Sequence, residues 1–341
     1  MNFITGATGL IGSHLTAHLL MQGKDVIALK RVNSNTKNIE EILSFYTTDY
    51  KELFKKIRFV EGDITDIYSL LDVLDNIEQV YHCAGMVNFE EKRIKELLLI
   101  NSEGTANMVN ACLEKGIQQF CHVSSVATMP NHDKKAIVDE SVFWKSSPEN
   151  GAYAISKYNG EREVWRAAEE GLNVCIVNPS VVLGAGCWGQ SSSRLIAECY
   201  KGTRFFTNGV TGFVDVKDVV HCMIGLMDQT DRQTGKKING KRFVVSGDNQ
   251  SFKYVLDQFH TAFGKKLPSI EAGKWILKTG ALLEKIFSSE PRITKTTIDA
   301  ALSKNYFSHE RISTELNFNF TPLDQTITYV AEKYKNYRTN N

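Results

Sequence analysis

Two residues on one helical face are the first candidates for chemistry. The segment YAISK places the phenol of Tyr153 and the ammonium group of Lys157 about one helical turn apart. A free tyrosine titrates near pH ~10, and a neighbouring cation lowers that pKa by favouring the phenolate. We therefore expect Lys157 to lower the pKa of Tyr153, so that Tyr153 exchanges a proton with a substrate oxygen as general acid and base. The alternative is a partly exposed helix face, because this spacing also arises by chance.

Two serines stand where a hydroxyl could bind the same oxygen. Ser124 and Ser125 follow the apolar run Phe120–Val123, which predicts a buried strand. Ligands of parallel sheets bind at the carboxyl ends of the strands. Either serine could therefore donate a hydrogen bond to the oxygen that Tyr153 protonates.

A glycine-rich turn near the start of the chain predicts a dinucleotide site. TGATGLIG, residues 5–12, has the spacing GxxGxxG where a short apolar strand meets a helix. The first glycine permits a tight turn, the second lets the backbone approach a pyrophosphate, and the third allows close helix packing, while the helix N-terminus attracts phosphate. An ordinary turn between a strand and a helix is the alternative. The residues expected to contact the cofactor are Gly6, Thr8, Gly9, Leu10, Ile11 and Gly12.

Two cations after the second strand indicate which dinucleotide binds. A site for NAD usually has a carboxylate here for the adenosine ribose, whereas this chain has Lys30 and Arg31. A guanidinium grips a phosphate through paired hydrogen bonds, so we expect NADP(H) in preference to NAD(H), with two solvated surface cations as the alternative. Asp63, after the third strand, is placed to meet the adenine amino group, or instead to cap the helix that begins near Thr65.

Strands and helices alternate along most of the chain, which predicts the scaffold for these groups. The expected strands are residues 2–5, 25–29, 57–60, 79–83, 120–123, 172–177 and 242–245, and a helix is expected at 10–21. Mostly apolar strands separated by helices are typical of a parallel sheet covered on both faces. The predicted fold class is α/β, a Rossmann-like doubly wound parallel sheet with a smaller, mainly helical substrate-binding lobe.

The alternation loosens after Pro179, where no regular strand is expected at once. Gly184, Gly186 and Gly189 predict a loop that borders the site, and residues from Phe252 onward are mainly helical. We expect residues 1–180 to form the dinucleotide-binding domain, with 211–250 returning to it, and residues 181–341, mainly 181–210 and 251–341, to form the substrate-binding lobe. The segment 36–56 is longer than a usual connection and predicts a further helix.

Composition and charge exclude several other classes of protein. Of 341 residues, 42% are apolar, and the formal net charge is +1 with scattered basic residues, so no nucleic-acid partner is expected. The seven cysteines form no CxxC pair, which indicates reduced, buried thiols and no metal site. No apolar run reaches the roughly 20 residues of a membrane span, and the stretch 275–287 predicts an amphipathic helix. We expect a cytoplasmic protein with no membrane partner.

Together these motifs resemble the extended short-chain dehydrogenase/reductase family, within the NAD-dependent epimerase/dehydratase superfamily, over nearly the whole chain. The matching segments are TGATGLIG at 5–12, Gly62-Asp63, HCAG at 82–85, Asn101 in NSEGTANMVNAC, HVSS at 122–125, YAISK at 153–157 and NPSVVLG at 178–184. The resemblance implies that Ser125, and not Ser124, is the catalytic serine, and that Lys157 also binds the nicotinamide ribose. It implies that the backbone from Pro179 to Val181 orients the nicotinamide. The further cofactor contacts that it implies are Ile64, Cys83, Ala84, Gly85 and Asn101.

The family that the chain resembles contains carbonyl reductases, hydroxysteroid dehydrogenases, nucleotide-sugar epimerases and sugar dehydratases. The fold therefore does not decide the reaction, which we infer from the positions where this chain departs from the motifs of each subgroup. Sugar dehydratases carry an acidic pair after the serine, where this chain has Val126 and Ala127. Epimerases typically have an arginine before FxxVxD, where this chain has Thr211. The segment FVDVKDV at 213–219 is similar to that of dihydroflavonol-reductase-like and aldehyde-reductase-like members. We therefore expect NADPH-dependent reduction of a ketone or aldehyde, with an NAD-dependent nucleotide-sugar epimerase and a non-catalytic NADP(H)-binding sensor as alternatives.

The substrate is expected to be a small carbonyl or alcohol compound. Met86, Val87, Trp188 and Phe213 are expected to line an apolar pocket beside Ser125, with core or loop packing as the alternative. Related proteins often dimerise through helices that correspond here to residues 94–115 and 153–168, so a homodimer is expected.

Overall fold

Seven parallel strands form the main sheet of the protein, in the order β10-β6-β5-β4-β1-β2-β3. The computed structural model describes residues 1–132, 136–190, 192–229, 238–287 and 294–340. The strands are β1 Asn2–Thr5, β2 Val26–Lys30, β3 Arg58–Glu61, β4 Gln79–His82, β5 Gln119–Val123, β6 Asn173–Pro179 and β10 Lys241–Val245. All seven expected strands are present, with ends that differ by at most two residues. The predicted fold class is confirmed.

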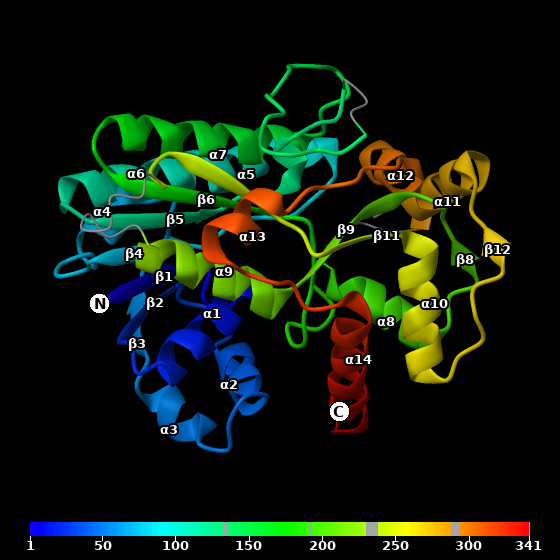
Figure 1. The fold of residues 1–341 in the computed structure, drawn as a ribbon, viewed down its shortest axis with the longest axis horizontal. Coiled ribbons are helices and arrows are strands. Elements are labelled where there is room, and N and C mark those ends of the chain that lie inside the picture. The colour runs from blue at the N-terminus through cyan, green and yellow to red at the C-terminus, as the bar shows by residue number, and fades with distance from the viewer. Residues whose placement is uncertain (133–135, 191, 230–237, 288–293, 341) are drawn as a thin grey trace.

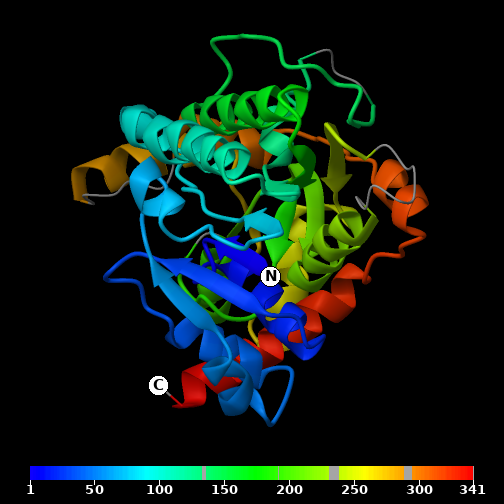
Figure 2. The same cartoon turned by 90° about the vertical axis from the view of Figure 1, so that its left-hand side faces the viewer.

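Helices cover both faces of this sheet (Figure 2). On one face lie α1 Leu10–Met21 and α9 Val216–Gln229, and on the other lie α4 Ile67–Leu71, α5 Ile94–Leu98, α6 Gly104–Glu114 and α7 Ala152–Glu169. Because side chains alternate along a strand, Phe3 of β1 packs into the layer with Met108 of α6, while Ile4 packs into the layer with Leu15 of α1. Strands buried on both faces explain the nearly continuous apolar runs in the sequence.

A second group of elements lies beside one end of the main sheet (Figure 1). A three-stranded sheet contains β7 Val181–Leu183, β9 Val210–Asp215 and β11 Asp248–Ser251, and β8 Phe205–Phe206 pairs with β12 Ile270–Glu271. The helices of this group are α8 Ser193–Lys201, α10 Phe252–Phe263, α11 Lys274–Phe287, α12 Lys295–Leu302 and α14 Leu323–Asn340. Helix α13 Glu310–Leu316 instead packs against β10 and α9 of the main sheet. The expected helix over 275–287 is therefore present as α11.

The expectation that no regular strand follows Pro179 at once is wrong. β7 begins at Val181 and pairs in parallel with Phe213–Asp215 of β9. Three residues are too few to show a period in the sequence, and the strand exists because a segment 32 residues further along the chain supplies its partner. Gly186 and Gly189 follow in a loop with positive φ angles of 93° and 83°, as expected for glycine in such a loop. Of the serines after this loop, Ser191 lies outside the described residues.

The long segment after β2 contains two short helices, α2 Lys37–Ser44 and α3 Tyr50–Lys55. Ile39, Ile42 and Leu43 of α2 are fully buried against α1 in the core. The expected helix in this segment is confirmed, and it extends the apolar layer beyond the edge of the sheet.

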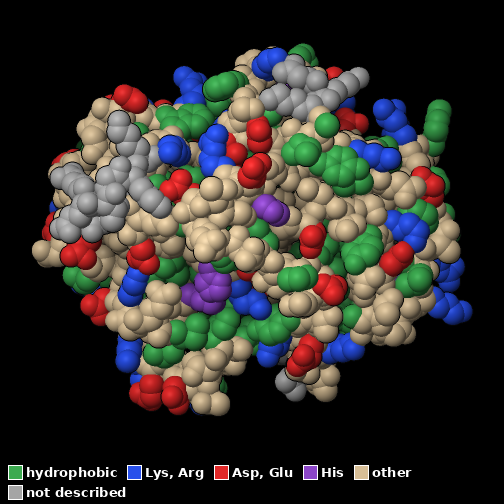
Figure 3. Space-filling model, viewed as in Figure 1, with side chains coloured by type: hydrophobic (Ala, Val, Ile, Leu, Met, Phe, Trp, Pro, Cys, Tyr) green, Lys and Arg blue, Asp and Glu red, His purple; other side chains and the backbone are tan. Residues whose placement is uncertain are grey.

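Charged side chains of both signs are interspersed over the face of the molecule shown in Figure 3. All seven cysteines are free, and six of them are buried, as expected for reduced core thiols. Among the described helices, none combines the length and the apolar character that crossing a bilayer requires.

Candidate active site

The carboxyl ends of the parallel strands bring the candidate residues to one edge of the sheet. β4 and β2 lie on opposite sides of β1, so the chain reverses its winding direction at β1. Ligands of doubly wound sheets bind at such a switch point. Gly6 follows β1, Arg31 follows β2, Cys83 follows β4 and Ser125 comes just after β5.

The glycine turn is shaped by close backbone approaches. Gly6 has a φ of 65°, and a Cβ atom on it would lie 2.6 Å from the backbone nitrogen of Ala84. A Cβ atom on Gly12 would lie 2.3 Å from the carbonyl oxygen of Gly6. Gly9 is the N-cap of α1 and has no side chain that could occupy the helix terminus. This cradle of backbone at a helix N-terminus fits the pyrophosphate of a dinucleotide.

The two cations at the end of β2 have different surroundings. The Lys30 ammonium lies 2.7 Å from the carboxylate of Glu61 in the neighbouring strand, which compensates its charge. Arg31 is exposed, in a turn where its backbone nitrogen donates to Ser34. Arg31 is therefore the better placed of the two to bind a phosphate.

Asp63 organises the turn after β3. One of its carboxylate oxygens accepts hydrogen bonds from the backbone nitrogen and the hydroxyl of Thr65, at 2.9 Å and 2.8 Å. The helix itself, α4, begins at Ile67 and is capped by Asp66. Asp63 therefore does not cap α4. Its hydrogen bonds with Thr65 occupy one of its two carboxylate oxygens. Ile64 is 8% exposed, and its side chain packs in the core.

Ser125, Tyr153 and Lys157 come together from β5 and α7. The hydroxyl of Ser125 accepts a hydrogen bond from the backbone nitrogen of Ala127 and caps the short turn Val126–Thr128. Helix α7 begins at Ala152, which places Tyr153 in its first turn, near enough to the Ser125 side chain for that hydroxyl to lower the pKa of the phenol. One turn later, Lys157 is 4% exposed, and its ammonium donates to the carbonyl oxygen of Val123 at 2.7 Å. The three expected catalytic residues therefore occupy one site.

Burial dominates the electrostatics of this site. It raises the pKa of Tyr153, and the hydrogen bond with Ser125 opposes this change only in part. It also lowers the pKa of Lys157 to about 8, although the charge of Glu161 acts in the opposite direction. We expected Lys157 to bring the pKa of Tyr153 below its usual value, and instead the net shift is upward, because desolvation of the phenol is the largest effect on it. At neutral pH the site holds a protonated phenol beside an ammonium group.

Asn101 fixes the loop after β4 to α7. It lies fully buried in a π-helical turn, Leu99–Glu103, between α5 and α6. Its amide accepts from the backbone nitrogen of Met86 at 2.8 Å and donates to the Met86 carbonyl and to Ser156, both at 2.9 Å. The side chain is thereby engaged in holding the loop, so its expected part in cofactor binding is to shape Gly85 and Met86.

The expected substrate-contacting side chains are distributed unevenly. Val87 is 49% exposed, and its neighbour Phe89 packs edge-to-face on Tyr153 with ring centroids 5.4 Å apart. Phe213 is 1% exposed in β9 and packs against Phe252, so it belongs to the core and not to an accessible pocket surface. The expectation that Phe213 lines the pocket is therefore wrong, because the pairing of β9 turns its side chain inward.

Trp188 also has a packing role. Its indole nitrogen donates to Glu41 of α2 at 3.0 Å, and its ring packs edge-to-face on Tyr334 of α14. Pro179 is the last residue of β6, and Val181 begins β7 two residues later.

The contact of Phe89 with Tyr153 was not predicted from the sequence, because no spacing rule relates these two residues.

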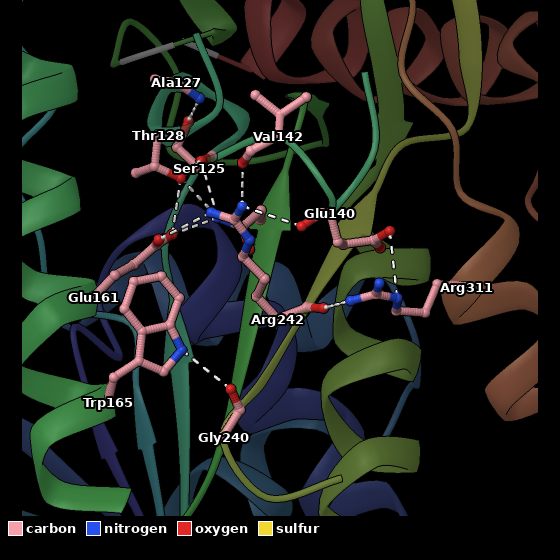
Figure 4. Close-up of polar contacts among 11 residues, drawn as sticks. Ser125, Ala127, Thr128, Glu140, Val142, Glu161, Trp165, Gly240, Arg242 and Arg311 are labelled. Atoms are coloured by element: carbon pink, nitrogen blue, oxygen red, sulfur yellow. Dashed lines mark hydrogen bonds and ion pairs between the residues drawn. The ribbon is translucent and has the colours of Figure 1, made fainter. Parts of the chain in front are cut away.

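A buried polar cluster lies behind the site and was also missed. Glu161 of α7 is fully buried, as are Thr128 and Asn178, which both donate to its carboxylate. The guanidinium of Arg242, from β10, lies 3.7 Å from the same carboxylate and faces the indole ring of Trp165 (Figure 4). The position of Glu161, one turn after Lys157 on the same face, was the one available signal in the sequence.

Comparison with known proteins agrees with this geometry. The model of the NAD dependent epimerase/dehydratase family matches residues 2–239. The chain belongs to this family. A Synechocystis sp. protein with the provisional name dihydroflavonol 4-reductase is 25% identical over 343 residues, covering 98% of this chain and 94% of the relative. Cinnamoyl-CoA reductase 1 of Petunia hybrida is 26% identical over 257 residues, covering 72% and 74%.

Solved structures share the fold. The Bordetella bronchiseptica enzyme WbmG, in complex with NAD and UDP, superimposes with a TM-score of 0.72 at 19% identity, covering 98% of this chain and 95% of that one. As a member of the epimerase/dehydratase family, the protein is an NAD(P)-dependent oxidoreductase, and the resemblance to extended short-chain dehydrogenases is confirmed. Among the described residues, no group of three His, Cys, Asp or Glu side chains is arranged to hold a metal ion.

Proposed function

We propose that the protein uses NADPH to reduce a ketone or aldehyde to an alcohol, reversibly. The observation that carries this proposal is the convergence of Ser125, Tyr153 and Lys157 at the carboxyl edge of the sheet, where burial raises the pKa of the Tyr153 phenol and keeps it protonated. A protonated phenol beside a hydroxyl donor is what a developing alkoxide requires. The names of the reductase relatives support the same direction of chemistry.

Each residue then has a defined task. NADPH, when bound, would supply the hydride that the carbonyl carbon accepts. Ser125 holds the carbonyl oxygen, and the Tyr153 hydroxyl gives that oxygen its proton. The Lys157 ammonium stabilises the tyrosinate that remains. The glycine cradle binds the pyrophosphate, and Arg31 binds the 2′-phosphate that distinguishes NADP from NAD.

We also propose which residues form the substrate-binding lobe and its pocket, and how two copies of the chain associate. Residues 181–210 and 251–341 form the substrate-binding lobe, and Met86 and Val87 line its pocket. Two copies associate through α5, α6 and α7, which sedimentation analysis of the purified protein will test.

The decisive experiment combines a nucleotide assay with a substrate panel. The purified protein is analysed for nucleotide that purifies with it, and NADPH oxidation is followed against aldehydes, ketones and UDP- or GDP-sugars. We expect NADPH consumption with a carbonyl compound and a stoichiometric amount of alcohol. Epimerisation of a sugar nucleotide without net NADPH consumption would replace this proposal by an epimerase, and nucleotide binding without any turnover would replace it by a sensor.

A further inference from the structure

Glu161 is a buried charged residue to which the proposed reaction gives no role. It lies on α7 one turn after Lys157 and two turns after Tyr153, and its side chain is fully buried. The pKa of Glu161 is raised because of burial, and Ser124, Arg242, Thr128 and Asn178 act in the opposite direction. A buried ion pair is not needed for stability, since apolar residues of similar size often replace such a pair without loss. The position of this carboxylate therefore calls for another explanation.

The first connection of Glu161 leads to Ser125. The Thr128 hydroxyl lies 2.9 Å from the Glu161 carboxylate and 2.9 Å from the Ser125 carbonyl oxygen. The Asn178 amide donates to the same carboxylate and, at 3.1 Å, to the same carbonyl oxygen. The amide of Asn178 has two N–H groups and therefore joins the Glu161 carboxylate to the backbone of Ser125, while the single proton of the Thr128 hydroxyl lies between the same two acceptors (Figure 4).

The second connection of Glu161 leads to Lys157. The other titratable groups whose charges interact with Lys157 in the described structure are His82, His122 and Cys83. Burial lowers the pKa of His82 to about 3 and holds that of His122 well below its usual value, and it raises the pKa of Cys83 to about 12, so all three are neutral at pH 7. Glu161 is therefore the charged group that opposes the desolvation of the Lys157 ammonium.

Arg242 keeps this carboxylate in place from the opposite side. The Arg242 guanidinium donates to the carbonyl oxygens of Glu140 and Val142, and these hydrogen bonds fix the position of the guanidinium. It therefore neutralises Glu161 only from 3.7 Å, without a hydrogen bond to the carboxylate. Glu161 lies one turn from Lys157 on α7, and the charge of its carboxylate acts to raise the pKa of the lysine.

We propose that Glu161 is a positioning residue that holds Ser125 through Thr128 and Asn178 while its negative charge stabilises the Lys157 ammonium. The inference deepens the proposed function, on which it rests for the chemical meaning of Ser125 and Lys157. Its physical content, a charge that acts on Lys157, is independent of the substrate and can be measured without turnover.

The experiment compares Glu161→Gln with Glu163→Gln in the full chain. Both substitutions remove one carboxylate from α7, but Glu163 pairs with Arg166 at the surface and does not face the site. The pKa of Lys157 is read by NMR titration of protein with labelled lysine side chains, with the signal assigned by Lys157→Met. Glu161→Gln should lower that pKa by on the order of one pH unit, and Glu163→Gln should leave it unchanged. An unchanged Lys157 pKa in Glu161→Gln overturns the proposal, whether or not the protein turns over a carbonyl compound.

Kinetics then separate the two connections. With an active substrate, Glu161→Gln should move the alkaline limb of the kcat profile to lower pH, because the ammonium is lost earlier. Thr128→Val keeps the charge and should lower kcat several-fold without moving that limb or changing the KM for NADPH. If Glu161→Gln does not fold, Glu161→Asp keeps the charge and should leave the Lys157 pKa close to that of the parent protein. A Lys157 pKa lowered by about one unit in Glu161→Asp would also contradict the proposal.

Discussion

Replacement of Lys157 by methionine should separate the chemical task of this lysine from its effect on folding. The side chain is 4% exposed, and burial lowers its pKa from 10.5 to about 8. Methionine has a similar length and no charge, so it fills the same space. We expect the variant to lose turnover and to unfold with a pH dependence that differs from that of the parent protein.

The magnitude follows from the linkage between protonation and folding. Between pH ~8 and ~10.5 the unfolded parent chain carries a proton on Lys157 that the folded chain has released, so the stability of the parent rises with pH in this window. A difference of about 2.5 pH units corresponds to roughly 3 kcal/mol. This stability is absent at pH 7, where the ammonium is buried in the folded state, and it is fully present above pH ~10.5. This pH-dependent contribution to the free energy of unfolding is absent from Lys157→Met.

Urea unfolding of both proteins at pH 7 and pH 10 measures the effect. The free energy of unfolding of the parent, minus that of Lys157→Met, should increase by roughly 2 to 3 kcal/mol between the two pH values. Other titrating groups are common to both proteins, so their contributions cancel. Lys95→Met, at an exposed position of α5, is the matched control and should show no comparable change. A difference that stays constant, or that falls with pH, would refute the assignment of Lys157 as a desolvated ammonium.

Two further predictions concern catalysis and cofactor choice. Tyr153→Phe keeps the ring that packs on Phe89 and removes the proton donor, so kcat/KM should fall by about 10²- to 10⁴-fold while the Kd for NADPH, measured by fluorescence, stays within a factor of about two; full retained activity would show that the proton comes from elsewhere. Arg31→Asp should raise the KM for NADPH about tenfold or more and affect NADH much less, since a carboxylate repels the 2′-phosphate. A parent enzyme that already prefers NADH would contradict the role of Arg31.

Much of the fold could be read from the sequence because its signals are local. Mostly apolar runs of four to six residues, separated by segments with a helical period, identified all seven strands of the main sheet. The spacing of Gly6, Gly9 and Gly12 is a requirement of the backbone at one turn, and the close approaches at Gly6 and Gly12 satisfy it. β7 was missed because its strand depends on a partner, β9, far along the chain.

The chain itself determined which groups are available and in which order the strands present them. A parallel sheet collects its carboxyl ends at one edge, so the choice of Ser125, Tyr153 and Lys157 followed from sequence position and resemblance. Only the tertiary structure decided the electrostatics, because desolvation depends on what packs around a group: burial raises the pKa of Tyr153, against the expected effect of Lys157. The same holds for Glu161, whose partners Thr128, Asn178 and Arg242 come from three separate elements and meet only in the folded protein.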